Sequence, residues 1–525
     1  MVLLRSRRLV LLLLLGGLFF GALSRATIAA GEVAAEQSPK SRFFYNDDGD
    51  RVIFLLKGPF HETQLYNTVD VLVGTAVTTL VYCVSDDTAR YPSEVASGYE
   101  WRRTAYVDMP GNAFQRLYLV TQQLRQEGID PVKVIMERAV RQGLEFVPSL
   151  RMNDGHFGQK EPATKHPRTS RFWMENRELA IEPGSDHFPT CVLDFTHEKV
   201  RNYRLAQIRE IINRYAVDGF EMDFTRHYMF FPSGKQRPEL ITEMVRKTRG
   251  WLDEKTKQDD KRRMLIVRVA RSLDCCRVLG CDVPTWVKEG LVDYLVPSSP
   301  DRYFTFDLPI EEFIEVAKGT RCRAVASPDS WKATPDMYRA GICNYYAKGQ
   351  QDTYLFNFFT PRAEQRQYFP FRNEDYALLR DLKGPVTLWG RPKLFGVDHF
   401  FRGGGRIALA KPGKNYDVGI YVGEDLAACR EAMILKHARL NLKIEGRQDG
   451  DQLEIALNGH TLQLGDAELE ATSITFDLKE PLPRKGHNTV TVTVKKLADS
   501  RRETRPTITW LELATAYDIT GVLPP

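Results

Sequence analysis

The 525-residue sequence predicts an α/β fold, a (β/α)8 barrel followed by an all-β C-terminal sandwich. Two observations predict it. Between residues 42 and 395, short apolar runs rich in β-branched and aromatic residues alternate with longer amphipathic stretches, which is the pattern of βα units around a parallel sheet. From residue 396 to residue 525, apolar residues recur at every second position, which is typical of antiparallel strands.

The barrel prediction rests on eight candidate strands in about 350 residues. They are residues 52–56, 78–84, 144–150, 219–224, 264–270, 292–297, 322–327 and 353–359. Residues 131–142 and 200–215 carry the one-sided apolar spacing of covering helices. An open doubly wound sheet is the alternative, but no GxGxxG follows an early strand and no phosphate-binding loop is present, so we expect no nucleotide cofactor and no other cofactor.

The C-terminal prediction is carried by a hairpin. Leu453, Ile455 and Leu457 alternate up to Asn458-Gly459, and alternation resumes after it. Asn-Gly between alternating apolar residues is a strong signal for a two-residue hairpin turn. The sandwich has two open roles, packing against the barrel or binding a sugar.

The first thirty residues resemble a secretory signal peptide. Four arginines and no acidic residue occur there, residues 9–23 are apolar, and small residues around Ala30 suit cleavage. Fifteen helical residues rise only about 22 Å, short of a bilayer core of about 30 Å. We therefore expect a secreted or periplasmic protein, with a membrane anchor formed by residues 9–23 as the alternative.

The charge balance disfavours a nucleic-acid partner. The chain has 73 Lys and Arg against 68 Asp and Glu, and removing the four leader arginines from the net charge of +5 leaves +1. Such a balance lacks the excess basic charge that polyanion binding requires.

No metal site is expected from sequence spacing. The eight cysteines form no CxxC pair, and His156, His187, His197 and His227 form no HxH or HExxH pair. A metal-dependent hydrolase therefore ranks behind the other functional hypotheses.

The strongest candidates for catalysis are Glu221 and Asp223. Alternation along residues 219–224 places both on the inward face of the fourth strand, at the carboxyl end where barrel enzymes keep their reactive groups. Carboxylates two residues apart lie about 6 to 7 Å from each other at the backbone, and glycosidases use acid pairs about 5 to 9.5 Å apart. The structural alternative is that Glu221 pairs with an inward arginine such as Arg268.

The segment from Asp218 to His227, which reads DGFEMDFTRH, resembles the strand-four motif of the alpha-amylase superfamily. By that resemblance Asp223 is the nucleophile, and Arg226 and His227 bind sugar. That superfamily carries an arginine two residues before the aspartate, where this chain has Glu221.

A wider resemblance, over residues 43–395, is to glycosyl-hydrolase-like barrel proteins common among exported bacterial proteins. It rests on three segments, LDFTHEKVRNY at 193–203, VDGFEMD at 217–223 and WVKEGLVD at 286–293. The resemblance implies carbohydrate hydrolysis without fixing the sugar.

Further candidates for substrate binding follow other predicted strands. They are Arg151, Asn153, Asp154, Arg268, Arg271 and Asn357. Arginine and asparagine offer fixed donors to hydroxyl or carboxylate groups, and Arg151 and Arg268 together suggest an acidic sugar. Asp154, Asp301 and Asp329 are alternative sources of a general acid.

The leading hypothesis is therefore an exported glycoside hydrolase acting on an oligo- or polysaccharide, with Asp223 as nucleophile or base and Glu221 as acid. The alternative is a non-catalytic carbohydrate-binding or cell-surface protein that kept the barrel and lost the reaction.

Overall fold

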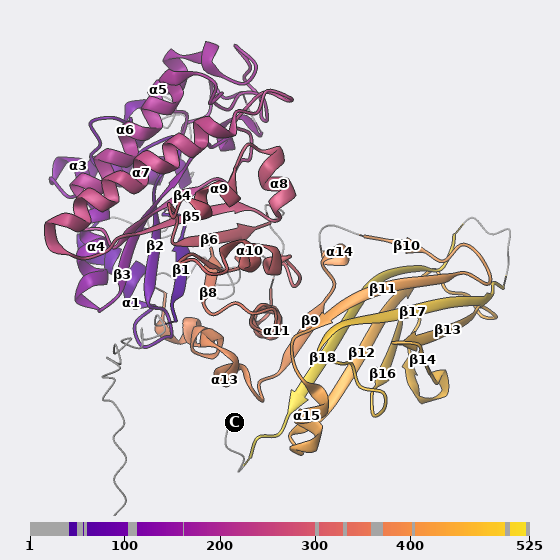
Figure 1. Cartoon of the computed structure of the whole chain (residues 1–525). Helices are drawn as coiled ribbons and strands as arrows, with labels where there is room; N and C mark the ends of the chain where they lie inside the picture. The colour runs from indigo at the N-terminus through magenta and orange to yellow at the C-terminus, as the bar shows by residue number, and fades with distance from the viewer. Residues whose placement is uncertain are drawn as a thin grey trace, which may run out of the picture. The chain divides into compact units, whose positions relative to one another are not determined.

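Eight parallel strands form a curled sheet, with helices around its outer side (Figure 1). The hydrogen-bonded order is β7-β6-β5-β4-β3-β2-β1-β8, so strands that follow one another in sequence are neighbours in space. The strands are β1 (Phe43–Asp47), β2 (Thr79–Ser85), β3 (Glu145–Arg151), β4 (Gly219–Asp223), β5 (Met264–Ala270), β6 (Tyr294–Ser298), β7 (Arg323–Ala324) and β8 (Thr353–Phe356). The predicted barrel topology is confirmed.

The computed structural model describes residues 41–49, 56, 60–102, 113–160, 162–299, 304–328, 333–358, 371–401, 405–498 and 504–520. The predicted leader, residues 1–30, lies outside this range. Within it, no helix combines the length and the apolar character needed to cross a bilayer.

The α-helices of the barrel region range in length from 4 residues in α1 to 22 residues in α7. They are α1 (Asn67–Asp70), α3 (Ala113–Gln126), α4 (Pro131–Arg141), α5 (Arg171–Glu175), α6 (Glu198–Arg214), α7 (Pro238–Asp259), α8 (Leu273–Val278), α9 (Val283–Lys288), α10 (Ile310–Ala317), α11 (Pro335–Ala347), α13 (Pro385–Leu388) and α14 (Asp398–Phe401). Asp130 caps α4 by accepting from two backbone N–H groups, and Pro131 occupies its first turn. Short 3-10 helices complete the region at Glu62–Tyr66, Tyr99–Arg102, His156–Gly158, Arg177–Leu179 and Asn373–Lys383.

The first strand was predicted at the wrong place. We expected it at residues 52–56, whereas β1 is Phe43–Asp47, hydrogen-bonded to both β2 and β8. Residues 52–55 lie outside the described range, and Leu56 is in no strand. The Asn-Asp-Asp-Gly sequence at 46–49 reads as a turn, but Asn46 points into the barrel and is bonded there.

Two apolar cores lie on the two sides of the sheet. The inner one fills the barrel and consists of Phe44, Val81, Val147, Met264, Ile266, Tyr294, Val296, Val325, Tyr354 and Phe356. The outer one packs the other face of the strands, including Phe220 and Met222, against the helices. Alternate residues of one strand therefore enter different cores, as strand geometry requires.

Antiparallel sheets follow the barrel, as predicted. The strands are β9 (Lys393–Gly396), β10 (Ile407–Ala408), β11 (Asn415–Val422), β12 (Leu435–Glu445), β13 (Gln452–Leu457), β14 (His460–Leu462), β15 (Ala467–Leu469), β16 (Ser473–Asp477), β17 (Gly486–Lys496) and β18 (Thr507–Tyr517). One sheet has the order β10-β18-β12-β16-β15 with β9 on β18, and the other has β11-β17-β13-β14. Helix α15 (Leu426–Glu431) and a 3-10 turn (Leu464–Asp466) lie between strands.

The predicted hairpin is confirmed. Leu457 and His460 pair across the turn, and Asn458 and Gly459 have φ of 51° and 84°. Positive φ at both central residues is what a type I′ turn requires.

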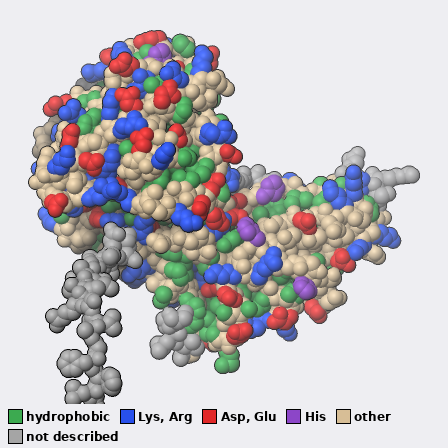
Figure 2. Space-filling model, in the orientation of Figure 1, with side chains coloured by type: hydrophobic (Ala, Val, Ile, Leu, Met, Phe, Trp, Pro, Cys, Tyr) green, Lys and Arg blue, Asp and Glu red, His purple; other side chains and the backbone are tan. Residues whose placement is uncertain are grey.

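Acidic and basic side chains are interspersed over the face seen in Figure 2.

Candidate active site at the carboxyl ends of the barrel strands

Inward-facing polar side chains meet where β3, β4 and β5 end. The strand register pairs Arg151 with Asp223, and Asp223 with Arg268. Paired residues of adjacent parallel strands point to the same face, so these three side chains form one row. Phe220 packs in the outer core, which leaves Glu221 and Asp223 facing the barrel interior, as the alternation predicted.

Glu221 is fully buried among neutral donors. Its Oε1 accepts from Asn46 Nδ2 at 2.9 Å and Ser149 Oγ at 2.7 Å, and its Oε2 accepts from Tyr354 Oη at 2.6 Å. Burial, and then the nearby Asp223 charge, raise the pKa of Glu221 to about 7. A substantial fraction of this carboxyl group is therefore protonated at neutral pH.

Asp223 is held in the ionised form. Burial alone would raise its pKa, but Arg268 and the hydrogen bonds from Thr225 lower it below the ordinary value. Arg268 Nη1 lies 3.1 Å from Oδ2, and the backbone and hydroxyl of Thr225 donate to Oδ1 at 2.8 and 2.7 Å. Arg268 is itself fixed by Ser298 Oγ at 3.0 Å and by the Phe356 ring, whose centroid is 3.8 Å away.

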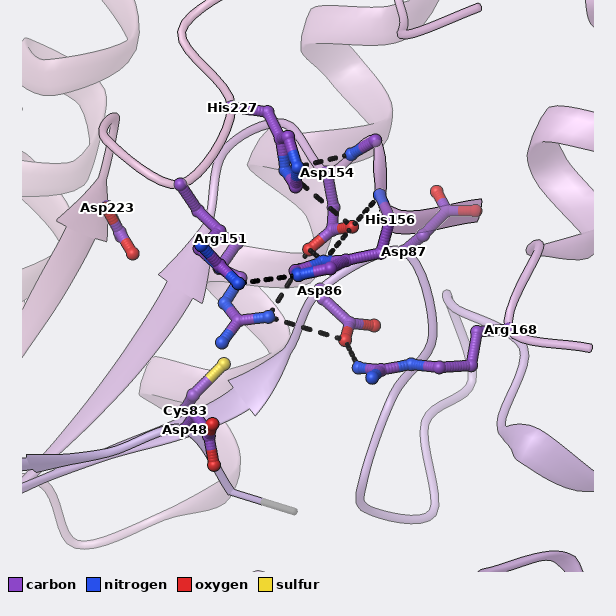
Figure 3. A network of polar contacts seen from close by, with 12 residues as sticks. Asp48, Cys83, Asp86, Asp87, Arg151, Asp154, His156, Arg168, Asp223 and His227 are labelled. Atoms are coloured by element: carbon purple, nitrogen blue, oxygen red, sulfur yellow. Dashed lines mark hydrogen bonds and ion pairs between the residues drawn. The ribbon is translucent and has the colours of Figure 1, made fainter. Parts of the chain in front are cut away.

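Arg151 lies between the carboxylates of the loops after β2 and β3. Its Nη1 lies 3.4 Å from Asp154 Oδ2 and 4.0 Å from Asp86 Oδ2 (Figure 3). Asp86 also accepts from Arg90 at 3.0 Å and from Arg168. Although burial opposes ionisation, Arg168 and Arg90 lower the pKa of Asp86, so this acid is ionised as well.

Asp154 is bonded to His156. His156 Nδ1 lies 2.8 and 3.0 Å from the two oxygens of Asp154, and its Nε2 lies 2.7 Å from Arg226 Nη2. Because Arg226 can only donate, Nε2 accepts and the ring proton is on Nδ1, directed at Asp154. Burial acts against ionisation of Asp154, but His156 lowers its pKa well below the ordinary value. Asp154 is therefore not a proton donor at neutral pH.

His227 is a buried neutral imidazole. Its Nδ1 accepts the Gly155 N–H at 3.0 Å, and its Nε2 lies 2.9 Å from Gln159 Nε2. Burial lowers the pKa of His227 to about 3. The same ring lies 3.9 Å from Asp154.

Asn153 and Asn357 hold loops in the described structure. Asn153 Nδ2 donates to the carbonyls of Leu193 at 2.9 Å and Met229 at 2.6 Å, which ties three chain segments together. Asn357 donates to Asp48 Oδ2 at 2.8 Å and accepts from the Asp48 N–H at 3.1 Å. Both side chains are buried, and their amide groups form hydrogen bonds that hold these loops.

Of the remaining candidates, Arg271 is half-buried just after β5. The alternative acids Asp301 and Asp329 lie outside the described residues.

Several site residues were absent from the sequence prediction. Asn46 and Tyr354 come from strands at the far side of the barrel, and only strand pairing brings them to Glu221. Asp86, which directly follows β2, and His156, which is two residues after Asp154, are the other two. The Asp-Gly-His spacing at 154–156 was the one local signal that could have drawn attention to His156.

Residues 50–240 match the model of a family described as Glycosyl hydrolase-like 10. The matched segment contains β2, β3 and β4, and with them Asp86, Asp154, Glu221 and Asp223. It ends before β5 and Arg268. The chain therefore carries a glycosyl hydrolase-like segment, and no curated protein matches the chain.

Solved structures similar to this chain include three carbohydrate-active enzymes. A cycloisomaltooligosaccharide glucanotransferase from Paenibacillus sp. has a TM-score of 0.33 at 7% identity, over 90% of this chain and 57% of that one. A GH36 alpha-galactosidase from Geobacillus stearothermophilus has 0.32 at 12%, over 87% and 55%. A family 18 N-acetylglucosaminidase from Paenibacillus barengoltzii has 0.28 at 11%, over 55% and 68%. The chain spans little more than half the length of the first two.

Proposed function

We propose that the protein is an exported glycoside hydrolase that acts on an oligo- or polysaccharide at the carboxyl ends of the barrel strands. The export part of this proposal rests on the leader sequence alone. The observation that carries the proposal is a pair of adjacent inward carboxyl groups, Glu221 and Asp223, whose pKa values are shifted in opposite directions. A protonated and an ionised acid side by side are what glycosidic bond cleavage needs.

In this proposal Asp223 is the ionised partner. It attacks the sugar carbon or activates water, and Arg268 and Thr225 keep it charged. Glu221 is the protonated partner. The Ser149 and Tyr354 hydroxyls that contact Glu221 can accept its proton in a hydrogen bond, since a hydroxyl both donates and accepts.

Sugar contacts are assigned to the polar groups of the surrounding loops. In this proposal Arg226 and Arg271, both half-buried, donate to hydroxyl or carboxylate groups of the sugar, whereas Arg151 pairs with Asp154. The similarity of residues 218–227 to the alpha-amylase motif supports the role of Asp223 and stays a prediction.

A second candidate is a carbohydrate-binding protein without hydrolytic activity. One observation favours it: all four oxygens of Glu221 and Asp223 already accept hydrogen bonds from the protein, and the two residues are 0% and 2% exposed.

The test separates the two candidates. The purified chain is incubated with a panel of polysaccharides, and new reducing ends are measured for the parent, Asp223→Asn, Glu221→Gln and Asp274→Asn, an exposed control acid. We expect the first two substitutions to reduce activity by about a hundredfold or more, as loss of an acid or base does, and the control to keep it. Binding to a glycan without release of reducing ends by the parent would favour the second candidate.

A further inference from the structure

Two histidines and one aspartate from separate loops converge beside the candidate active site (Figure 3). Asp154 and His156 follow β3, and His227 follows β4. One ligand atom from each lies within 4.8 Å of the other two. We propose that Asp154, His156 and His227 bind a zinc ion that joins these two loops. This inference does not rest on the proposed hydrolase activity.

The distances are close to those of a tetrahedral site. Asp154 Oδ1 lies 2.8 Å from His156 Nδ1 and 3.9 Å from His227 Nδ1. Ligand atoms about 2.1 Å from a tetrahedral zinc are about 3.4 Å apart, a value between the two observed. Zinc binding would replace the proton that joins His156 Nδ1 to Asp154.

The ligand types suit zinc. Two imidazoles and one carboxylate are a combination that zinc binds with one coordination position left for water. The side chains of Asp154 and His227 are 3% and 4% exposed, whereas that of His156 is 21% exposed. The ion would therefore be enclosed on the side of Asp154 and His227 and open to solvent beside His156.

One outer contact suits a metal-bound histidine. Gln159 lies 2.9 Å from the Nε2 atom of His227. With Nδ1 of His227 on the metal, Nε2 carries the proton, and the Gln159 amide can accept it through its oxygen after a rotation of the group.

Two contacts compete with the ion. Arg226 donates to Nε2 of His156, and the Gly155 N–H donates to Nδ1 of His227. A metal on Nδ1 of His156 would place a proton on Nε2, facing the guanidinium, so Arg226 must turn away. A metal on Nδ1 of His227 would take the lone pair that now accepts from Gly155, so this backbone N–H must turn away as well. We therefore expect Arg226→Gln, whose amide oxygen can accept that proton, to strengthen zinc binding.

The experiment is a zinc titration of the chelator-treated full chain, followed by calorimetry and by the thermal midpoint of unfolding. It uses a Cys275→Ser background, because Cys275 is an exposed thiol that can bind zinc by itself. We expect one zinc per chain, a rise of the midpoint with zinc, and a four-coordinate absorption spectrum with cobalt.

The variants identify the ligands. His227→Gln and Asp154→Asn should each weaken binding at least tenfold, Arg226→Gln should tighten it several-fold, and His460→Gln, an exposed histidine of β14, should leave it unchanged. Absence of a zinc-dependent midpoint shift in the parent, or equal affinity in parent and His227→Gln, would overturn the proposal. If Asp154→Asn does not fold, the opposite changes in zinc affinity expected for His227→Gln and Arg226→Gln still test the proposal.

Discussion

Arg268 pairs with Asp223 across β4 and β5 in the interior of the barrel. The atoms Nη1 and Oδ2 lie 3.1 Å apart, and the two side chains are 4% and 2% exposed. The structural alternative considered from the sequence was a pair between Arg268 and Glu221. The arginine instead bonds the acid directly opposite it in the strand register, and Glu221, two residues earlier, is bonded by neutral groups.

Breaking this buried pair should destabilise the protein. Arg268→Met leaves the Asp223 carboxylate without its cation, and we expect the free energy of unfolding to fall by about 3 kcal/mol. The double variant Arg268→Met/Asp223→Asn removes both charges and should lose less than the sum of the single losses. Urea unfolding of the three variants and the parent measures this, and additive losses would contradict a direct pair.

Glu221 should make stability depend on pH between its unfolded and folded pKa values. Its folded pKa of about 7 lies above the ordinary value, so the folded state retains a proton that the unfolded state has lost. The stabilising contribution is complete below pH 4.5 and is lost as pH rises toward 7. Relative to the parent, Glu221→Gln should therefore gain up to about 3 kcal/mol over this range. Chemical unfolding at pH 5 and pH 8 tests it, and a difference independent of pH would show that Glu221 is ionised in the fold.

Asn153 should stabilise the loops around the candidate active site. Asn153→Ala deprives the Leu193 and Met229 carbonyls of a donor in a buried setting, at a cost of about 2 kcal/mol. The exposed Asn202→Ala, on α6, is the matched control and should change little. Thermal unfolding compares them, together with the rate of limited proteolysis between β3 and α6, which should rise only in Asn153→Ala. Equal midpoints would show that the hydrogen bonds of Asn153 do not stabilise these loops.

Much of the architecture can be predicted from local sequence because strand and helix periodicities are local properties. Residues 264–270 were predicted as a strand and form β5 with the same bounds, and Asn458-Gly459 forms the expected turn. β1 escaped prediction because its polar end is stabilised by partners more than 170 residues away, Glu221 and Tyr354.

Local strand geometry is enough to predict that Glu221 and Asp223 share the inward face of β4, because side chains alternate on any strand. Their different protonation states depend on residues from other strands. Arg268 on β5 keeps Asp223 charged, whereas burial and the neighbouring Asp223 charge favour the proton on Glu221. The approach of His156 to His227 likewise depends on packing. Arg226, next to His227, is 70 residues from His156 in the sequence, and the two loops meet because β3 and β4 are neighbours in the sheet.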